Sequence, residues 1–143
     1  MPYTDLMKTT LLLCVSLASL LVAAPAFAQT IESSSHSSVG YIESDGTIEN
    51  SSHSTVGYIQ SDGTIENASH STIGYVRSGT VENSSHSTVG YIQHDGTVEN
   101  SSHSTIGYVK KDGTVEDSSH STIGYARGVR ASWAAVAFFF FKF

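Results

Sequence analysis

The stretch TVENSSHSTIGYVKKDG, residues 97–113, decides the fold of this chain. It contains two short runs rich in β-branched residues, T-V-E-N and S-T-I-G-Y-V, which are typical of β-strands. A polar Asn-Ser-Ser-His stretch separates the two runs, and Asp-Gly ends the segment. An Asp-Gly pair between β-branched runs indicates a hairpin, because glycine adopts a positive φ at no steric cost. The segment therefore predicts two strands joined to each other and to the next segment by turns.

This sequence pattern recurs six times between residues 30 and 128 with a period of 17 residues. The third copy lacks one residue, and the sixth is truncated. Every copy keeps the Glu of the first run, Ser-His-Ser, Gly-Tyr and a closing Gly. The two residues before Asp-Gly, such as Gln60-Ser61 and Lys110-Lys111, change charge freely, so we expect them to face water. The third copy keeps Gly79 without an Asp before it, which predicts a tighter turn.

The second run of each copy is apolar on both faces of the predicted strand. In residues 104–109, the period of two places Ile106 and Tyr108 on one face and Gly107 and Val109 on the other. Such a strand is packed on both sides, and its glycine makes room for a close neighbour. Each repeat carries too few apolar side chains to fold alone, so neighbouring repeats must complete its core.

Two architectures fit such a repeat, a β-solenoid with one repeat per rung and a closed ring of hairpins. The Asp-Gly turns favour hairpins. Closure also removes the exposed sheet edges that a short solenoid would have to cap. We therefore expect the ring.

The segments GYIQSDGTIENSSHSTVGYI and GYARGVRASWAAVAFFFF resemble a family of small exported Bacteroidetes-type proteins, the five-fold β-flower proteins. The resemblance covers residues 30 to about 141 and implies five hairpins around a pseudo-five-fold axis, with no activity to carry over. Five complete units of the form GY…G-T-[IV]-E are present. The predicted fold is an all-β closed ring of about five hairpins, in which the unpaired halves, 30–33 and 121–126, close the ring.

Residues 1–28 are predicted to be a signal peptide, with Met7 as the expected true start. An apolar run follows one basic residue and ends at Ala26-Phe27-Ala28, a small-x-small cleavage pattern. The alternative, a membrane anchor, needs about 20 apolar residues. We therefore expect a protein exported from a Gram-negative bacterium, in the periplasm, on the outer surface or outside the cell. The repeat domain is then 29–128, which has no cysteine.

The tail, residues 129–143, reads VRASWAAVAFFFFKF. It is too short for a membrane helix, and the repeats are too short for the strands of an outer-membrane barrel. We expect it to pack on the ring or plug it, with Trp133 and the four Phe from 138 to 141 as anchors. The alternative is an exposed tail, which would allow self-association or membrane contact.

The histidines are the candidates of most interest for chemistry. One stands at the same place in each repeat, whereas His94 is isolated. In a ring, equivalent positions form a circle, which near the axis could hold a metal ion with the parallel set of glutamates from Glu49 to Glu116. The simpler interpretation is structural, with a ring nitrogen accepting a backbone N–H in the turn. The metal-ligand candidates are His36, His53, His70, His86, His103 and His120.

The repeated tyrosines are the second set, and core packing with the hydroxyl at the rim is the expected role. Exposed, they could instead bind sugars or peptides. The set comprises Tyr41, Tyr58, Tyr75, Tyr91, Tyr108 and Tyr125.

Composition and motifs argue against several function classes. A net charge of −6 does not favour nucleic acid, which needs clustered Lys and Arg. No phosphate loop or metalloprotease signature is present, and Ser-His adjacency alone does not make a catalytic triad. We therefore expect no enzyme and no cofactor, but an exported structural or surface-binding module for a glycan or protein. The alternative is a small-ligand or metal binder that uses the histidine ring.

Overall fold

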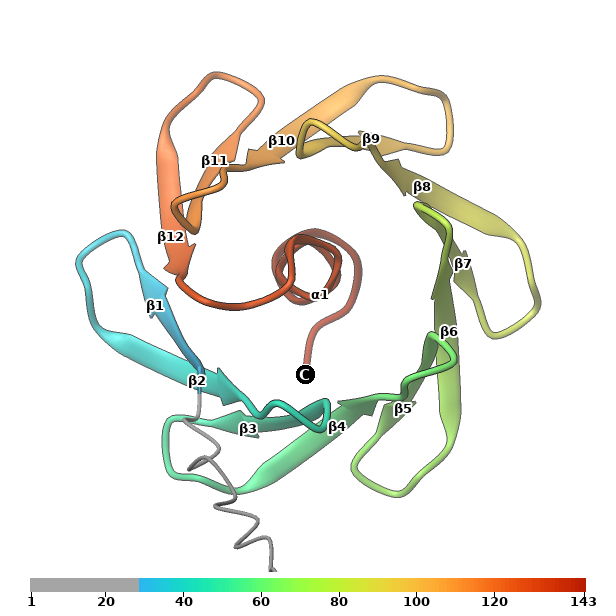
Figure 1. The fold of residues 1–143 in the computed structure, drawn as a ribbon. Helices are drawn as coiled ribbons and strands as arrows, with labels where there is room; N and C mark the ends of the chain where they lie inside the picture. The colour runs from blue at the N-terminus through green and yellow to red at the C-terminus, as the bar shows by residue number, and fades with distance from the viewer. Residues whose placement is uncertain (1–28) are drawn as a thin grey trace, which may run out of the picture.

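The computed structural model describes residues 29–143, and the predicted signal peptide and start site lie outside them. Twelve antiparallel strands in this part of the chain form one closed ring, in which each strand pairs with its neighbours in sequence (Figure 1). The ring architecture is confirmed, and the solenoid is excluded. The strands are β1 (Gln29–Ser33), β2 (Ser38–Ile42), β3 (Thr47–Asn50), β4 (Thr55–Ile59), β5 (Thr64–Asn67), β6 (Thr72–Arg77), β7 (Thr80–Asn83), β8 (Thr88–Ile92), β9 (Thr97–Asn100), β10 (Thr105–Val109), β11 (Thr114–Asp117) and β12 (Thr122–Ala126).

The two ends of the repeat region close the ring, as predicted. Strand β1 pairs with β12 with Ile31 opposite Ala126 and Glu32 opposite Tyr125. The neighbouring pair β2–β3 has the same kind of register, with Tyr41 opposite Glu49. The closing pair therefore continues the sheet without leaving a free edge.

The expected count of about five hairpins needs correction. Five strand pairs are joined by the Gly-containing turns, and β12 with β1 makes a sixth equivalent pair without a covalent link. Counted by the Ser-Ser-His turns instead, residues 29–126 form six hairpins, which are the petals of Figure 1. The two half-units at the ends belong to petals equivalent to the others, so that the complete petals number six.

The buried face of the sheet points toward the ring axis. The β-branched residue of each first run is buried, as are Ile42, Ile59, Val109 and Ala126 of the second runs. All of these residues except Val81 form one cluster with Trp133, Ala134, Ala135 and Val136 of the tail. The first-run core residues are Ile31, Ile48, Ile65, Val81, Val98 and Val115.

A β-bulge in each second run corrects the predicted faces. In the β9–β10 pair, Thr105 lies opposite Glu99 but Gly107 lies opposite Val98, so Ile106 is the extra residue. A bulge re-aims the side chain that it carries. Ile106 packs against the core cluster, whereas Tyr108 stacks on His120. The two residues predicted to share a face therefore make contacts with different parts of the molecule.

The tail forms two short helical elements, α1 (Ala131–Ala135) and the π-helix η1 (Val136–Phe140). In Figure 1 they lie at the centre of the ring. Trp133 is 7% exposed and Val136 is fully buried. No helix within residues 29–143 is long and apolar enough to span a bilayer.

Candidate functional site

The outer turns, which carry Ser-Ser-His and join the two strands of each petal, form the most regular set of polar side chains. In the β3–β4 turn, the N–H of His53 donates to the carbonyl of Asn50 at 3.0 Å, and the N–H of Asn50 donates to the carbonyl of Ser54 at 3.0 Å. The Asn50 side-chain oxygen accepts the N–H groups of Ser52 and Ser54. This is a tight turn closed by one residue in the left-handed region.

That left-handed residue is the histidine in every petal. The six φ values lie between 58° and 64°. Glycine is the usual residue in this region, although histidine is enriched there among the others. The histidines in question are His36, His53, His70, His86, His103 and His120.

Each of these histidines bonds the glutamate four residues before it. The Nδ1 atom lies 2.9 Å from Oε2 of Glu49 in the case of His53, and between 2.9 and 3.2 Å in all six petals. A carboxylate can only accept, so Nδ1 of the ring carries the proton. A ring nitrogen was expected to accept a backbone N–H; instead, Nδ1–H donates to this carboxylate.

Each histidine also stacks on a tyrosine of the preceding petal. The Tyr41 and His53 rings lie 4.2 Å apart at an angle of 14°. Because Tyr41 is opposite Glu49 in the sheet, the three side chains form one cluster across two petals. His36 stacks on Tyr125 in the same way across the closing strand pair, at 4.3 Å. All six clusters are therefore equivalent, and we call each one a Tyr-Glu-His cluster.

The clusters lie at the periphery and not at the axis. The outer turns are the tips of the petals in Figure 1, far from the central helix. The histidine side chains are 55–65% exposed, whereas the tyrosines are half-buried beneath them. The predicted circle of imidazoles near the axis is therefore wrong in its position, and the tyrosines form the base of the outer turns.

The metal candidates are consequently separated from one another. Within residues 29–143, no group of three or more His, Cys, Asp or Glu side chains is placed to hold a metal ion. Each imidazole has one carboxylate beside Nδ1, and its Nε2 atom keeps a lone pair. A single petal can thus accept a hydrogen bond at Nε2 and offer a flat ring face.

Three of the cluster glutamates have a second polar partner from the preceding inner turn. Gln60 donates to Glu66 at 3.1 Å, and Gln93 donates to Glu99 at 3.2 Å. The hydrogen bond from His70, followed by that from Gln60, lowers the pKa of Glu66. At Glu116, the ammonium group of Lys110 is the main cause of a lowered pKa. These contacts hold the carboxylates ionised beside the imidazoles.

Serine-histidine catalysis has no geometric support at these turns. Among the side-chain hydrogen bonds of residues 29–143, none joins a serine hydroxyl to an imidazole. In a catalytic triad the base accepts the proton of the nucleophile through this bond. The clusters are built from a glutamate, a histidine and a tyrosine instead.

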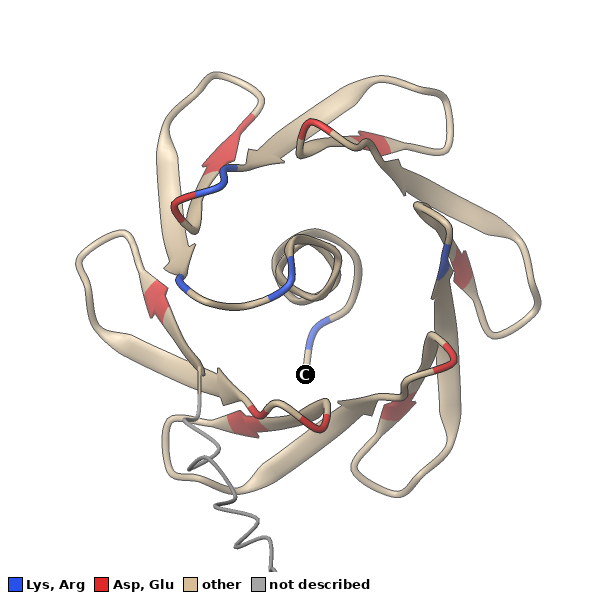
Figure 2. Cartoon of the chain, viewed as in Figure 1, with Lys and Arg blue, Asp and Glu red and all other residues tan. Residues whose placement is uncertain are grey.

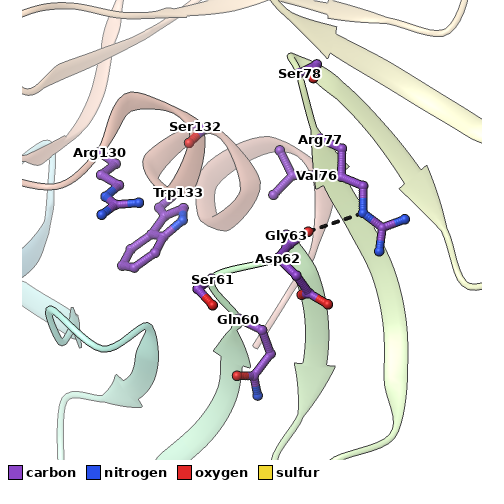
Figure 3. A pocket seen from close by; sticks show the side chains of 10 residues that line it. All are labelled: Gln60, Ser61, Asp62, Gly63, Val76, Arg77, Ser78, Arg130, Ser132 and Trp133. Atoms are coloured by element: carbon purple, nitrogen blue, oxygen red, sulfur yellow. Dashed lines mark hydrogen bonds between the residues drawn. The ribbon is translucent and has the colours of Figure 1, made fainter.

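A second polar feature lies beside the shortened third inner turn. A hollow of about 320 Å³ is bounded by Gln60–Gly63, by Val76–Ser78 and by the start of α1. Figure 3 shows Arg130 beside Trp133 and Arg77 on the opposite side, where its Nε donates to the carbonyl of Asp62 at 3.2 Å. Arg77 also covers Tyr75, and Arg130 covers Trp133, so both guanidinium groups already have partners.

The charges around this hollow are mixed. Figure 2 shows acidic residues repeated around the ring and basic residues both on the ring and on the central tail. Because no set of like charges converges on the hollow, the outer turns remain the stronger candidate.

The amino-acid sequence indicates the residue types of the Tyr-Glu-His clusters but not their contacts. The signal for the Glu-His bond was present, since the two residues are always four apart and flank a turn. The Tyr-His contact joins residues of different repeats, such as Tyr58 and His70, and required the register of the sheet.

Comparison with known proteins adds one finding. A family model described as 5-fold beta-flower protein matches residues 28–142. No curated protein matches the chain, and no solved structure matches it.

Proposed function

We propose that this chain, which belongs to the family of 5-fold beta-flower proteins, is an exported, non-enzymatic module that binds a repeating glycan. The family description names the fold and assigns no role. The six Tyr-Glu-His clusters at the petal tips are the proposed contact surface.

The observation that supports this proposal is the exposed histidine in a left-handed conformation at every petal tip. Holding a residue other than glycine there costs about 1–2 kcal/mol. Stacking on tyrosine stabilises the folded state by about 1 kcal/mol, and an exposed hydrogen bond to a carboxylate contributes little to stability. Folding therefore gains nothing clear from histidine at this place, and glycine would serve the turn as well. Strained residues that persist at equivalent surface positions are typical of binding sites.

The chemistry of the cluster suits a sugar. The free imidazole face can pack against the C–H face of a pyranose, while Nε2 accepts a hydrogen bond from a sugar hydroxyl. The serine hydroxyls of the same turn, such as Ser51 and Ser52, are exposed and can donate or accept. Each contact is weak, but a ring of six equivalent tips can engage a repeating ligand with high effective concentration.

Binding to purified polysaccharides of the bacterial envelope tests the proposal. The test variant replaces all six tip histidines by glycine, and the matched control replaces the isolated His94 by asparagine. We expect the control to bind as the unchanged protein does, and the six-fold variant to lose at least tenfold in apparent affinity. Addition of EDTA should change neither result.

Three outcomes would contradict it. The first is that the six-fold variant binds the polysaccharide as tightly as the unchanged protein does. The second is loss of binding on addition of EDTA, which would favour the metal alternative. The third is binding only to protease-sensitive envelope fractions, which would replace the glycan by a protein partner.

A further inference from the structure

The phenylalanines of the tail occupy a repeated seat on the inner face of the ring. At each of five strand glycines, a Cβ atom added to the backbone would fall within 3.0 Å of a phenylalanine ring, closer than real Cβ atoms approach. Each ring therefore sits directly on a glycine. A glutamate carbonyl oxygen of the neighbouring strand lies equally close at all six glycines, including Gly40, and by itself leaves no room for a side chain. The pairs are Phe138 on Gly124, Phe139 on Gly107, Phe140 on Gly90, Phe141 on Gly74 and Phe143 on Gly57.

The π-helical turn allows consecutive residues to reach consecutive petals. The N–H of Phe141 donates to the carbonyl of Val136 at 3.0 Å, an i to i−5 bond. An α-helix rotates about 100° per residue, which is more than the angle between neighbouring petals in a ring of six. The wider turn of a π-helix reduces the rotation per residue. From Phe141 back to Phe138, each residue moves one petal along the ring, from β6 to β12.

One step further back, the series reaches Ala137 and the petal of β1 and β2. Its glycine, Gly40, is the sixth equivalent position, and no phenylalanine ring lies against it. A pocket of about 180 Å³ is found there instead. Its apolar lining comprises Ile31, Val39, Ile42, Ile48, Val56, Ala137 and Phe143.

The exposure of Val39 shows that this seat is open. Val39 is 50% exposed and is the only large hydrophobic residue among residues 29–143 with such an exposed side chain. Its equivalents in other petals, among them Val56, Ile73 and Ile123, are packed against the core. The difference follows from the ring that is missing over Gly40.

We propose that this seat binds one small monocyclic aromatic molecule of the benzene or phenol class. The five occupied seats show directly that a phenyl ring fits between the strand glycine and the tail. The sixth seat has the same glycine and a comparable apolar lining, with the small Ala137 in place of a phenylalanine. An apolar cavity of about 150 Å³ can bind benzene, and this pocket is of similar size.

Fluorobenzene is the probe, and its binding to the unchanged chain is followed by ¹⁹F NMR. We expect saturable binding with one site per chain, together with shifts of the Val39 methyl signals. Cyclohexanol, which lacks a flat ring, serves as the comparison and should bind at least fivefold more weakly. Absence of saturable fluorobenzene binding would overturn the proposal.

Two substitutions test the position of the site. Ala137→Phe supplies the missing ring and should weaken binding at least tenfold while raising the Tm; Ala137→Leu is the second variant if the first folds poorly. Phe140→Ala empties the seat over Gly90, and we expect two sites per chain. Unchanged binding in the folded Ala137 variants would place the ligand elsewhere and refute the proposal.

A second copy of the chain is the competing occupant of this seat. Sedimentation at increasing protein concentration separates the two cases. We expect a monomer whose fluorobenzene affinity does not depend on protein concentration. A dimer that fluorobenzene cannot dissociate, and that Ala137→Phe abolishes, would assign the seat to a second copy and contradict the small-molecule proposal.

Discussion

Four of the five inner turns share one backbone design with the outer turns but place a different residue at its left-handed position; the shortened third inner turn has two left-handed residues, Ser78 and Gly79. In the inner turn, the N–H of Gly46 donates to the carbonyl of Glu43 at 2.9 Å, and the N–H of Glu43 donates to that of Thr47 at 2.8 Å. The outer turn has the same two bonds around Asn50 and His53. Glycine stands in the inner turn with φ of 94°, and histidine stands in the outer turn with φ of 58°.

The surroundings explain this difference. A side chain at Gly46 would overlap the carbonyl oxygen of Ile59, because the Gly46 carbonyl accepts the Ile59 N–H from the next petal. The inner turn is thus enclosed between petals and the tail, and only glycine fits. The outer turn faces solvent, where a side chain is tolerated and can serve another purpose. Folding fixes the inner turn, whereas the outer turn is free to carry function.

The largest expected effect is that of Gly46→Ala. Its Cβ would meet backbone atoms that cannot move away, and φ would be unfavourable as well. We expect a loss of about 2–4 kcal/mol in the free energy of unfolding, measured by denaturant titration. Ser51→Ala, in the exposed outer turn, is the control and should change little. Equal effects of the two substitutions would remove the distinction between the turns.

A β-branched residue in the outer turn should have the next largest effect. His53→Val keeps a side chain at φ of 58° but loses the bond to Glu49 and the contact with Tyr41. Valine is strongly disfavoured in this region, so we expect a loss of about 2 kcal/mol. Thermal unfolding measures it, and a neutral result would show that the turn can change its conformation.

Acid should destabilise the inner turns that contain an aspartate. In these turns the aspartate side chain accepts the backbone N–H of the threonine two residues later. This hydrogen bond is the main reason why the aspartate pKa is lowered at Asp45, Asp62, Asp95 and Asp112. A folded-state pKa below the unfolded value gives stability that is present at neutral pH and is lost as pH falls through the folded pKa. We therefore expect the Tm to fall below about pH 4.

A four-fold Asp→Asn variant of these positions sharpens that prediction. Asparagine keeps the side-chain oxygen as acceptor but does not titrate, as in the outer turns at Asn50 or Asn67. The variant should have a smaller fall in Tm between pH 5 and pH 2 than the unchanged protein. The remaining slope would come from glutamates such as Glu66 and Glu99, whose pKa values are also lowered by hydrogen bonds. An identical acid slope would contradict the assignment.

The smallest effect is expected for His53→Gly. Relief of the left-handed strain, about 1 kcal/mol, offsets the lost stacking, also about 1 kcal/mol. The free energy of unfolding should therefore stay within about 0.5 kcal/mol of its starting value. A clear loss in denaturant titration would mean that the cluster contributes to folding.

Much of this fold could be predicted from the repeat. Alternation of β-branched residues and Asp-Gly turns predicted the strands, and the half-units at 30–33 and 121–126 predicted the closing pair. The faces of Ile106 and Tyr108 could not be predicted, because the bulge depends on the register between strands. The Tyr-Glu-His clusters join neighbouring petals, so local sequence reasoning placed His53 correctly in a turn but gave it the wrong partner.

The thermal unfolding midpoint of the variant with glycine at all six tip histidines tests the central distinction most directly. If the outer turns carry function and the inner turns carry the fold, this variant keeps a Tm within about 5 °C of the unchanged protein. A fall of about 15 °C or more, or loss of cooperative unfolding, would show that the histidines hold the ring together.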